Sequence, residues 1–313
     1  MYAQFFVLFA MIFTGYILRK IHLINDEMNS GLNSFILFFS FPCLIIQNIG
    51  TLEISNKVLG MFITTAGLAF VVIFVGTFIS YGYVKARKFP DRIRGVIEFA
   101  MTNPNSGFLG FPVALLCFGQ NGLLLMISSC FAFNIYTYGY GIVMLHRGEK
   151  KEKQKGAGLK LAVKTILNPN ILALFAGLAI TLTGITIPSP LLTFLNYMGG
   201  IATPMAMVYI GSSLAGSKFF EMFKNHIVWE SAAVKLFLLP AATTLIVYFL
   251  PVGSLVKMIT VLMMAFPTAA LVPMLSEQEG KDSSIATKVL FFSTVLSMAT
   301  LSFWITVITK LFA

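Results

Sequence analysis

The most chemically informative segment is a cluster of polar and helix-breaking residues inside the apolar run 94–118. The cluster consists of Asn103, Pro104, Asn105, Ser106 and Gly107. A proline removes one backbone donor and clashes with the preceding turn, so a helix that passes through this cluster should break. Backbone groups left unpaired in hydrocarbon are tolerated only inside protein or beside a water-filled cavity. The cluster therefore predicts a broken helix with amide and hydroxyl donors for a polar ligand.

A second break is predicted in the apolar run 255–276, where Pro267 and Thr268 follow Phe266. Each broken helix leaves a half-helix whose N-terminus carries roughly half a positive charge. Such an N-terminus is a site for a carboxylate or another anion. Two breaks that cross would place two positive helix ends together. We therefore predict an anion-binding site made by both segments.

Further candidates for the wall of this site are Asn134 and Tyr138, which are four residues apart and so share one helix face. Stripes of this kind also hold membrane helices together, so both interpretations stay open. Lys235 lies deep in another apolar run without a partner at helical spacing. It could neutralise a substrate carboxylate, replace a coupling cation, or pair with a carboxylate such as Glu98. An intramembrane charge is functional by default.

Two carboxylates inside apolar runs have simpler interpretations. Glu98 follows Arg94 by four residues, which predicts an ion pair on one helix face. Glu230 lies about one turn inside its apolar run, so its side chain is expected to reach toward water.

The sequence offers no signal for an enzyme, a metal or an organic cofactor. It contains no His-Glu-x-x-His zinc motif and no Gly-x-Ser-x-Gly nucleophile turn. Its three cysteines show no paired spacing. A channel would favour a continuous polar stripe, and a membrane sensor would usually carry a soluble domain. The net charge of +10 lies in short loops between apolar runs, which argues against nucleic acid as a partner.

The composition requires a lipid bilayer as the solvent. Of 313 residues, 57% are hydrophobic and 11% are charged, whereas a soluble domain carries about 25% charged residues. Ten apolar runs are long enough to cross about 30 Å of hydrocarbon. We predict membrane spans at 3–19, 31–50, 58–84, 94–118, 122–146, 168–186, 191–215, 226–250, 255–276 and 284–311.

The basic residues predict the orientation of these spans. Eighteen of the 22 lysines and arginines fall on alternate loops, and only Lys57, Lys257 and Lys310 fall on the opposite set. We predict that the protein lies in the cytoplasmic (inner) membrane. Because basic loops stay on the inner side, the first set of loops is expected in the cytoplasm. Both termini are then expected outside.

The basic stretch 147–164 is predicted to be a cytoplasmic linker that divides the chain into halves 1–146 and 165–313, with five spans each. An odd number of spans gives the halves opposite orientations, as in the inverted repeats of secondary transporters. Prolines recur at matching places, such as Pro42 in the second span and Pro204 in the seventh. A second Asn-Pro-Asn, at 168–170, is interpreted as the cap of the sixth span.

The segment Asn103 to Pro112, together with Asn168-Pro169 and Ala202-Thr203-Pro204, resembles the auxin efflux carrier family. The resemblance covers essentially the whole chain. It implies a fold similar to the bile-acid sodium symporters, with crossed fourth and ninth helices. It also implies a scaffold of spans 1, 2, 6 and 7, a mobile core of the others, and a homodimer through helices 1, 2 and 7. Bacterial members of this family are described as permeases for malate and other organic acids.

The sequence hypothesis is an all-α membrane protein of ten helices that carries a small, malate-like organic anion by alternating access. An exporter of auxin-like aromatic acids and a carrier of another anion are the alternatives. Phe266 stands where the plant exporters have an asparagine, which argues against aromatic acids. The coupling ion is left open by the sequence, with proton and sodium as the candidates.

Overall fold

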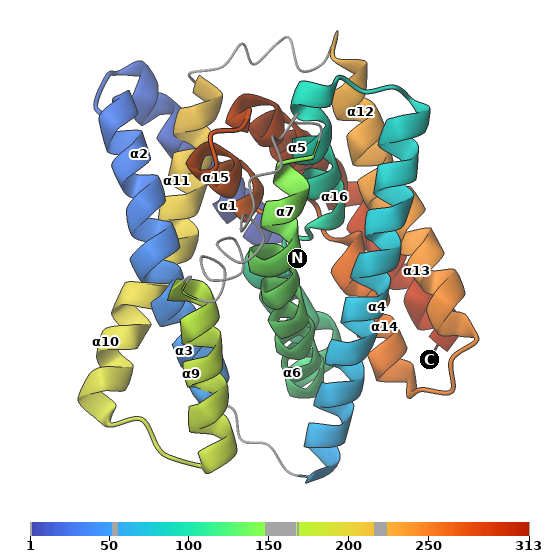
Figure 1. Ribbon diagram of the computed structural model, residues 1–313. Coiled ribbons are helices and arrows are strands. Elements are labelled where there is room, and N and C mark those ends of the chain that lie inside the picture. Colours follow the sequence, from blue (N-terminus) through green and yellow to red (C-terminus); the bar gives the residue numbers. More distant parts are fainter. Residues whose placement is uncertain (1, 52–55, 148–166, 168, 216–223, 313) are drawn as a thin grey trace, which may run out of the picture.

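The computed structural model describes residues 2–51, 56–147, 167, 169–215 and 224–312. Every regular element in these residues is a helix. The helices separate into two groups that stand side by side in Figure 1. We call residues 2–50 and 169–215 the panel group, and residues 56–147 and 226–312 the crossing group.

The panel group is built from the first and the middle parts of the chain. Its helices are α1 (Tyr2–Lys20), α2 (Asp26–Phe35), the π-helical turn η1 (Ile36–Ser40), α3 (Phe41–Gly50), α9 (Pro169–Thr183), α10 (Ser189–Gly200) and α11 (Ala202–Ala215). Helix α1 packs along α11, and α3 packs against both α9 and α10.

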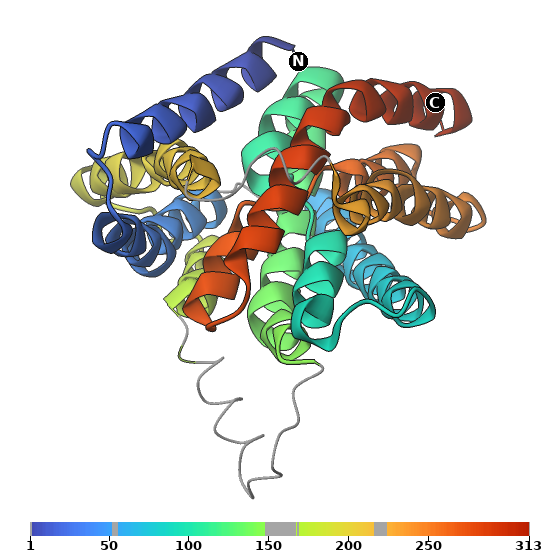
Figure 2. The ribbon, with the colours of Figure 1, turned by 90° about the horizontal axis from the view of Figure 1, so that it is seen from above.

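The crossing group holds the remaining helices. They are α4 (Asn56–Ala86), α5 (Asp91–Thr102), η2 (Ser106–Gly110), α6 (Phe111–Tyr136), η3 (Thr137–Gly141), α7 (Ile142–Leu145), α12 (His226–Ala233), η5 (Val234–Leu238), α13 (Leu239–Tyr248), α14 (Ser254–Ala265), α15 (Leu271–Gln278) and α16 (Ser283–Phe312). Seen from above, α16 runs diagonally across this group (Figure 2).

Among the described residues, six helical stretches are long and apolar enough to cross a membrane. They fall within or around the predicted second, third, fifth, seventh, eighth and tenth spans: Asp26–Gly50, Leu59–Ala86, Asn121–Leu145, Ser189–Ser213, His226–Tyr248 and Ser283–Phe312. The predicted fourth and ninth spans are absent from this set because each is interrupted, and α14 stands as a shorter apolar helix. The count of ten spans stays a prediction.

Local sequence explains where several helices begin and turn. The side chain of Asn25 accepts a hydrogen bond from the backbone N–H of Met28 at 2.8 Å and so caps α2. Pro188 precedes α10, where a proline fits the start of a helix. The chain reverses at Gly119, whose φ of 65° and ψ of −161° interrupt α6. A residue with a side chain is strained at this φ, so glycine suits the position.

Close backbone contacts between helices hold the panel group together. A Cβ atom on Gly211 would lie 1.8 Å from the carbonyl oxygen of Ile12, and a Cβ atom on Gly15 would lie 2.0 Å from that of Val208. These glycines let α1 and α11 approach more closely than any side chain would allow. Small residues play this role wherever lipid leaves packing as the main force between helices.

Prolines inside two helices release backbone carbonyls that side chains from other helices then bind. At Pro240 the helix has no N–H for the carbonyl of Leu236, and the indole Nε1 of Trp304 donates to that oxygen at 2.7 Å. Pro42 follows the π-helical turn η1, in which N–H groups bond carbonyls five residues earlier, so it has no N–H for the carbonyl of Leu37. The amide of Asn170 donates to that oxygen at 2.8 Å. The second Asn-Pro-Asn therefore does more than cap a helix, although Asn168 lies outside the described residues.

The predicted pairing of Glu98 with Arg94 is wrong. Glu98 is fully buried and bonds Nη1 of Arg147 at 2.5 Å, while Arg94 pairs with Asp91 at 2.8 Å. Helical spacing cannot anticipate Arg147, because it reaches Glu98 from a different helix end. Beyond Arg147 the predicted linker lies outside the described residues.

The other carboxylate, Glu230, does not simply reach into water. Nη2 of Arg87 bonds its Oε1 at 2.6 Å, Nε of Arg87 bonds its Oε2 at 2.9 Å, and the hydroxyl of Tyr83 donates to Oε2 at 3.1 Å. This two-point pair joins the end of α4 to α12.

Candidate functional site

The two predicted breaks meet each other in the crossing group. Helix α5 ends at Thr102 and η2 begins at Ser106, while α14 ends at Ala265 and α15 begins at Leu271. Pro104 lies opposite Thr268 in an isolated antiparallel bridge.

Two hydrogen bonds flank this bridge. The N–H of Asn105 donates to the carbonyl of Pro267 at 2.8 Å, and the N–H of Ala269 donates to the carbonyl of Asn103 at 2.9 Å. Each break thus satisfies backbone groups of the other, which removes much of the cost of an interrupted helix in an apolar interior.

Asn103 is a structural clamp in this arrangement. Its side-chain amide donates to the carbonyl of Phe99 at 2.7 Å and to the hydroxyl of Thr102 at 3.2 Å, and its oxygen accepts from Thr137 at 2.7 Å. The residue is fully buried. Its two amide hydrogens are therefore directed to protein, and its role as a donor to substrate stays a prediction.

Thr268 fastens the second break in the same way. Its hydroxyl donates to the carbonyl of Ala100 at 2.9 Å, and its backbone N–H donates to the hydroxyl of Ser293 at 3.1 Å. These bonds connect α5, the break after α14, and α16. Ser293 of α16 therefore contributes to holding these helices together.

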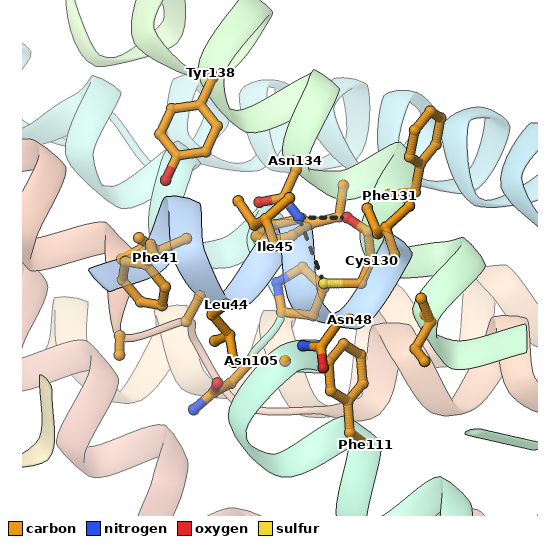
Figure 3. A pocket seen from close by; sticks show the side chains of 18 residues that line it. Phe41, Leu44, Ile45, Asn48, Asn105, Phe111, Cys130, Phe131, Asn134 and Tyr138 are labelled. Atoms are coloured by element: carbon orange, nitrogen blue, oxygen red, sulfur yellow. Dashed lines mark hydrogen bonds between the residues drawn. The ribbon is translucent and has the colours of Figure 1, made fainter. Parts of the chain in front are cut away.

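A small cavity of about 70 Å³ lies beside the crossing, between it and α3 of the panel group. A cavity needs roughly 10–15 Å³ on this measure to hold one water. The space therefore suits a molecule of a few heavy atoms. Figure 3 shows the cavity, which is lined by Phe41, Leu44, Ile45, Asn48, Ile49, Pro104, Asn105, Gly107, Phe111, Ile127, Cys130, Phe131, Phe133, Asn134, Tyr138, Ala269, Ala270 and Leu271.

The structure brings half of the predicted site residues to this cavity. Those in the lining are Pro104, Asn105, Gly107, Asn134 and Tyr138. The predicted residues outside the lining are Asn103, Ser106, Pro267, Thr268 and Lys235. Asn103, Pro267 and Thr268 belong to the breaks, Ser106 is the first residue of η2, and Lys235 lies in η5.

The hydroxyl of Tyr138 is a buried polar group beside the cavity. Its side chain is 1% exposed, and its hydroxyl has no hydrogen-bond partner among the described residues. In Figure 3 the ring projects from its helix toward the space near Asn134 and Phe41. A buried hydroxyl without a partner costs about 1–3 kcal/mol. A polar ligand in the cavity would recover this cost.

Three asparagines add amide groups to the same cavity. Asn105 comes from the first break, Asn134 from α6 and Asn48 from α3. The amide of Asn134 donates to the carbonyl of Cys130 at 2.8 Å, which holds its orientation. The sequence interpretation missed Asn48, although an amide inside the apolar run 31–50 was an available signal.

The electrostatic potential in the cavity comes from helix ends and not from charged side chains. No lysine, arginine, histidine, aspartate or glutamate occurs among the 18 described residues that line it. Positive potential comes instead from two helix N-termini, because Gly107 lies at the start of η2 and Leu271 at the start of α15. The remaining wall is mainly aliphatic and aromatic, which suits a hydrocarbon portion.

The described residues contain no group of three or more His, Cys, Asp or Glu side chains placed to hold a metal ion. The chemistry that the described cavity can support is recognition of a ligand by hydrogen bonds and helix ends.

The proteins similar to this chain are described as transporters. A family profile described as "Membrane transport protein" matches residues 1–305. An "Uncharacterized transporter" of Methanothermobacter thermautotrophicus is 24% identical, over 94% of each chain. A "Putative malonate transporter" of Rhizobium meliloti is 27% identical, over 94% of this chain and 91% of the relative. A further uncharacterized transporter, from Methanocaldococcus jannaschii, is 23% identical over 95% of this chain and 96% of its own.

Proposed function

The chain belongs to the membrane transport protein family, and on that premise we propose that it is a secondary transporter that carries a small organic anion by alternating access. It is a multi-pass membrane protein, as its apolar helices and its family require. Transport relatives point away from an enzyme. The substrate is held in the cavity beside the crossed breaks.

The observation that carries this proposal is the unpartnered hydroxyl of Tyr138 in a small cavity lined by Asn105, Asn134 and Asn48. A carboxylate accepts hydrogen bonds from amide and hydroxyl donors, and charge-assisted bonds are roughly twice as strong as neutral ones. Both helix N-termini that face the cavity add favourable potential. The other predicted binding residues, Asn103, Ser106, Pro267 and Thr268, then shape the backbone around the substrate.

Malonate is the first substrate to test. The name of the Rhizobium relative suggests it, and its few heavy atoms suit a cavity of about 70 Å³. Malate is the next candidate. A bulky aromatic acid is disfavoured by this volume, even though Phe41, Phe111 and Phe131 line the wall.

Two features support movement between the panel and crossing groups. On one side of the crossing, the cavity separates α3 from the two breaks. On the side of α15 the groups are joined by hydrogen bonds, because Tyr209 donates to Glu277 and Asn33 donates to the carbonyl of Met274. We propose that these contacts open when the cavity side closes, so that the substrate meets each side of the membrane in turn.

The wider architecture belongs to the same proposal. Ten spans in two inverted repeats would explain why breaks of similar form, at Pro104 and Pro267, meet in an antiparallel bridge. A cytoplasmic membrane with both termini outside follows from the distribution of basic loops. The panel group, whose span Ser189–Ser213 is buried over only 28% of its apolar window, offers surface for the proposed homodimer.

The experiment is counterflow in proteoliposomes, in which internal unlabelled malonate exchanges with external labelled malonate without any gradient. We expect saturable entry that is competed by other short carboxylates. Tyr138→Phe should reduce apparent affinity by about tenfold or more, because it removes one hydrogen bond to a charged group. Counterflow of no organic anion by folded protein would refute the proposal.

A further inference from the structure

Lys235 is a buried lysine that the cavity does not use. Its side chain is fully buried in η5, and its Nζ atom has no hydrogen-bond partner among the described residues. It is also absent from the lining of the cavity. Lysine is almost never fully buried without a partner, so this position calls for an explanation.

Neighbouring contacts place Lys235 at the level of the second break. A Cβ atom on Gly76 would lie 3.2 Å from Met264 and 3.7 Å from Leu239, so α4, α13 and α14 meet there. Lys235 precedes Leu239 by four residues, while Phe266 follows Met264 by two. Helices α13 and α14 run antiparallel, because a short turn joins the end of α13 to the start of α14. The step back from Leu239 to Lys235 and the step forward from Met264 to Phe266 therefore lead in the same direction. Lys235 therefore lies within about one helical turn of the level of the break.

The facing helix α4 shows the same register. Ser80 follows Gly76 by one turn, and its buried hydroxyl also lacks a partner among the described residues. One to two turns further along α4, Tyr83 and Arg87 bind Glu230 of α12. Helix α4 runs antiparallel to the segment from α12 to α13. Because Gly76 lies at the level of Leu239 and Tyr83 at the level of Glu230, the residues between these points also lie at corresponding levels. Ser80 and Lys235 thus occupy one level of the same interface.

The charged groups on the surrounding elements have other partners or lie elsewhere. On α5, Glu98 pairs with Arg147, and Arg94 pairs with Asp91. On α12, Glu230 pairs with Arg87. The charged residues of α14 and α16 lie near helix ends, at Lys257, Lys288 and Lys310. On α4 they are Lys57 and Lys85, again near the ends.

The sequence leaves three roles open for Lys235, and the positions of these charged groups and of the cavity leave one of them. It does not line the cavity, so it does not contact a substrate carboxylate there. It does not pair with Glu98, whose partner is Arg147. The remaining role is that of the coupling cation. A permanent charge without a partner in a low-dielectric interior costs several kcal/mol, so the amine should carry a proton only while an anion is bound nearby.

We propose that Lys235 takes up one proton for each substrate anion, so that proton and anion cross the membrane together; this rests on the proposed function. On the loading side the neutral amine accepts a proton from water and becomes an ammonium. On the opposite side the ammonium returns that proton to water as the anion leaves. Anion and proton each favour the binding of the other, because opposite charges attract strongly across a dry interior.

The test uses proteoliposomes with a pH-sensitive dye inside and labelled malonate outside. For the wild type we expect a proton to enter with each malonate beyond the protein-free control. An imposed gradient of one pH unit should raise accumulation by about tenfold, and a sodium gradient should have no effect. Lys235→Met should lose the gradient-driven accumulation while still eluting as folded protein.

The matched control is Lys257→Met, because Lys257 lies half-buried at the start of α14, where its Nζ bonds the carbonyl of Tyr248 at 3.1 Å and lies 5.6 Å from the centroid of the Phe312 ring. This variant should keep wild-type accumulation. Proton-driven accumulation by Lys235→Met equal to that of the wild type would overturn the proposal. If Lys235→Met does not fold, the wild-type ratio of protons to malonate decides, with one supporting the proposal and zero overturning it.

The outcomes also separate this inference from the proposed function. Wild-type counterflow of malonate without proton entry, or accumulation driven by sodium, removes the role of Lys235 and leaves the carrier in place. Absence of any carboxylate counterflow overturns both.

Discussion

The panel and crossing groups are built from similar apolar helices, and they differ most at the two breaks in the helices of the crossing group. In the panel group, α1 and α11 meet through backbone at Gly15 and Gly211. In the crossing group, the side chains of Asn103 and Thr268 bind backbone carbonyls near the C-terminal end of α5. In our proposal, the closely packed panel group supports the molecule, and the polar residues around the two breaks provide the binding groups.

The largest expected effect is on the packing of the panel group. Gly211→Ala would place a methyl group 1.8 Å from the carbonyl of Ile12, so α1 and α11 must move apart. Overpacking of this kind costs about 3 kcal/mol. Thermal unfolding in detergent should show a clear loss of stability. The matched control is Gly200→Ala, where a Cβ atom meets nothing within 4 Å; equal stability of the two variants would contradict the account of the panel.

In the crossing group, removal of a ligand donor should impair transport and leave stability almost unchanged. Asn105→Ala deletes an amide from the cavity, and one lost bond to a charged ligand is worth about 1.5–3 kcal/mol. The apparent affinity for malonate in counterflow should fall by roughly tenfold to a hundredfold. Asn29→Ala is a suitable control, because Asn29 bonds Ser213 at 3.2 Å within the panel group. If Asn29→Ala weakens transport as much as Asn105→Ala does, the cavity is not the binding site.

A third experiment compares the loss of stability when a backbone carbonyl freed by a proline loses its side-chain donor in each group. Trp304→Phe leaves the carbonyl of Leu236 without its donor in the crossing group. Asn170→Leu does the same to Leu37 in the panel group. Each should lower stability by about 1–3 kcal/mol, since a buried acceptor loses its bond. The two unfolding temperatures should fall together, and a change confined to one variant would show that only that carbonyl depends on its donor.

The smallest expected effect concerns the contact between the groups. Tyr209→Phe removes the bond to Glu277 and should favour separation of the groups on the side of α15. The loss of about 1 kcal/mol corresponds to about a fivefold shift between two conformations. Asn48→Cys, on a background without the three native cysteines, reports access to the cavity. Its labelling by a membrane-impermeant thiol reagent should slow when Tyr209→Phe is added; faster labelling would contradict the proposed motion.

Sequence reasoning located both breaks because proline and glycine act locally on the backbone. It also selected Asn105, Asn134 and Tyr138, whose polarity stands out in apolar runs. It could not find that the side-chain oxygen of Asn103 accepts a hydrogen bond from Thr137, because that contact depends on how the end of α5 lies against η3. The partner of Glu98 was missed for a similar reason. Asn48 joins the cavity from the panel group, and such contacts between distant helices leave no periodic signal.

The central claim is that a small organic anion binds in the cavity beside the crossing. The most direct test is protection of Asn48→Cys from the impermeant thiol reagent by malonate, since residue 48 lines the cavity from α3. We predict that malonate slows labelling in a saturable manner, and that Tyr138→Phe raises the concentration needed. Malonate that is transported by this variant yet leaves the labelling rate unchanged at every concentration would contradict the claim.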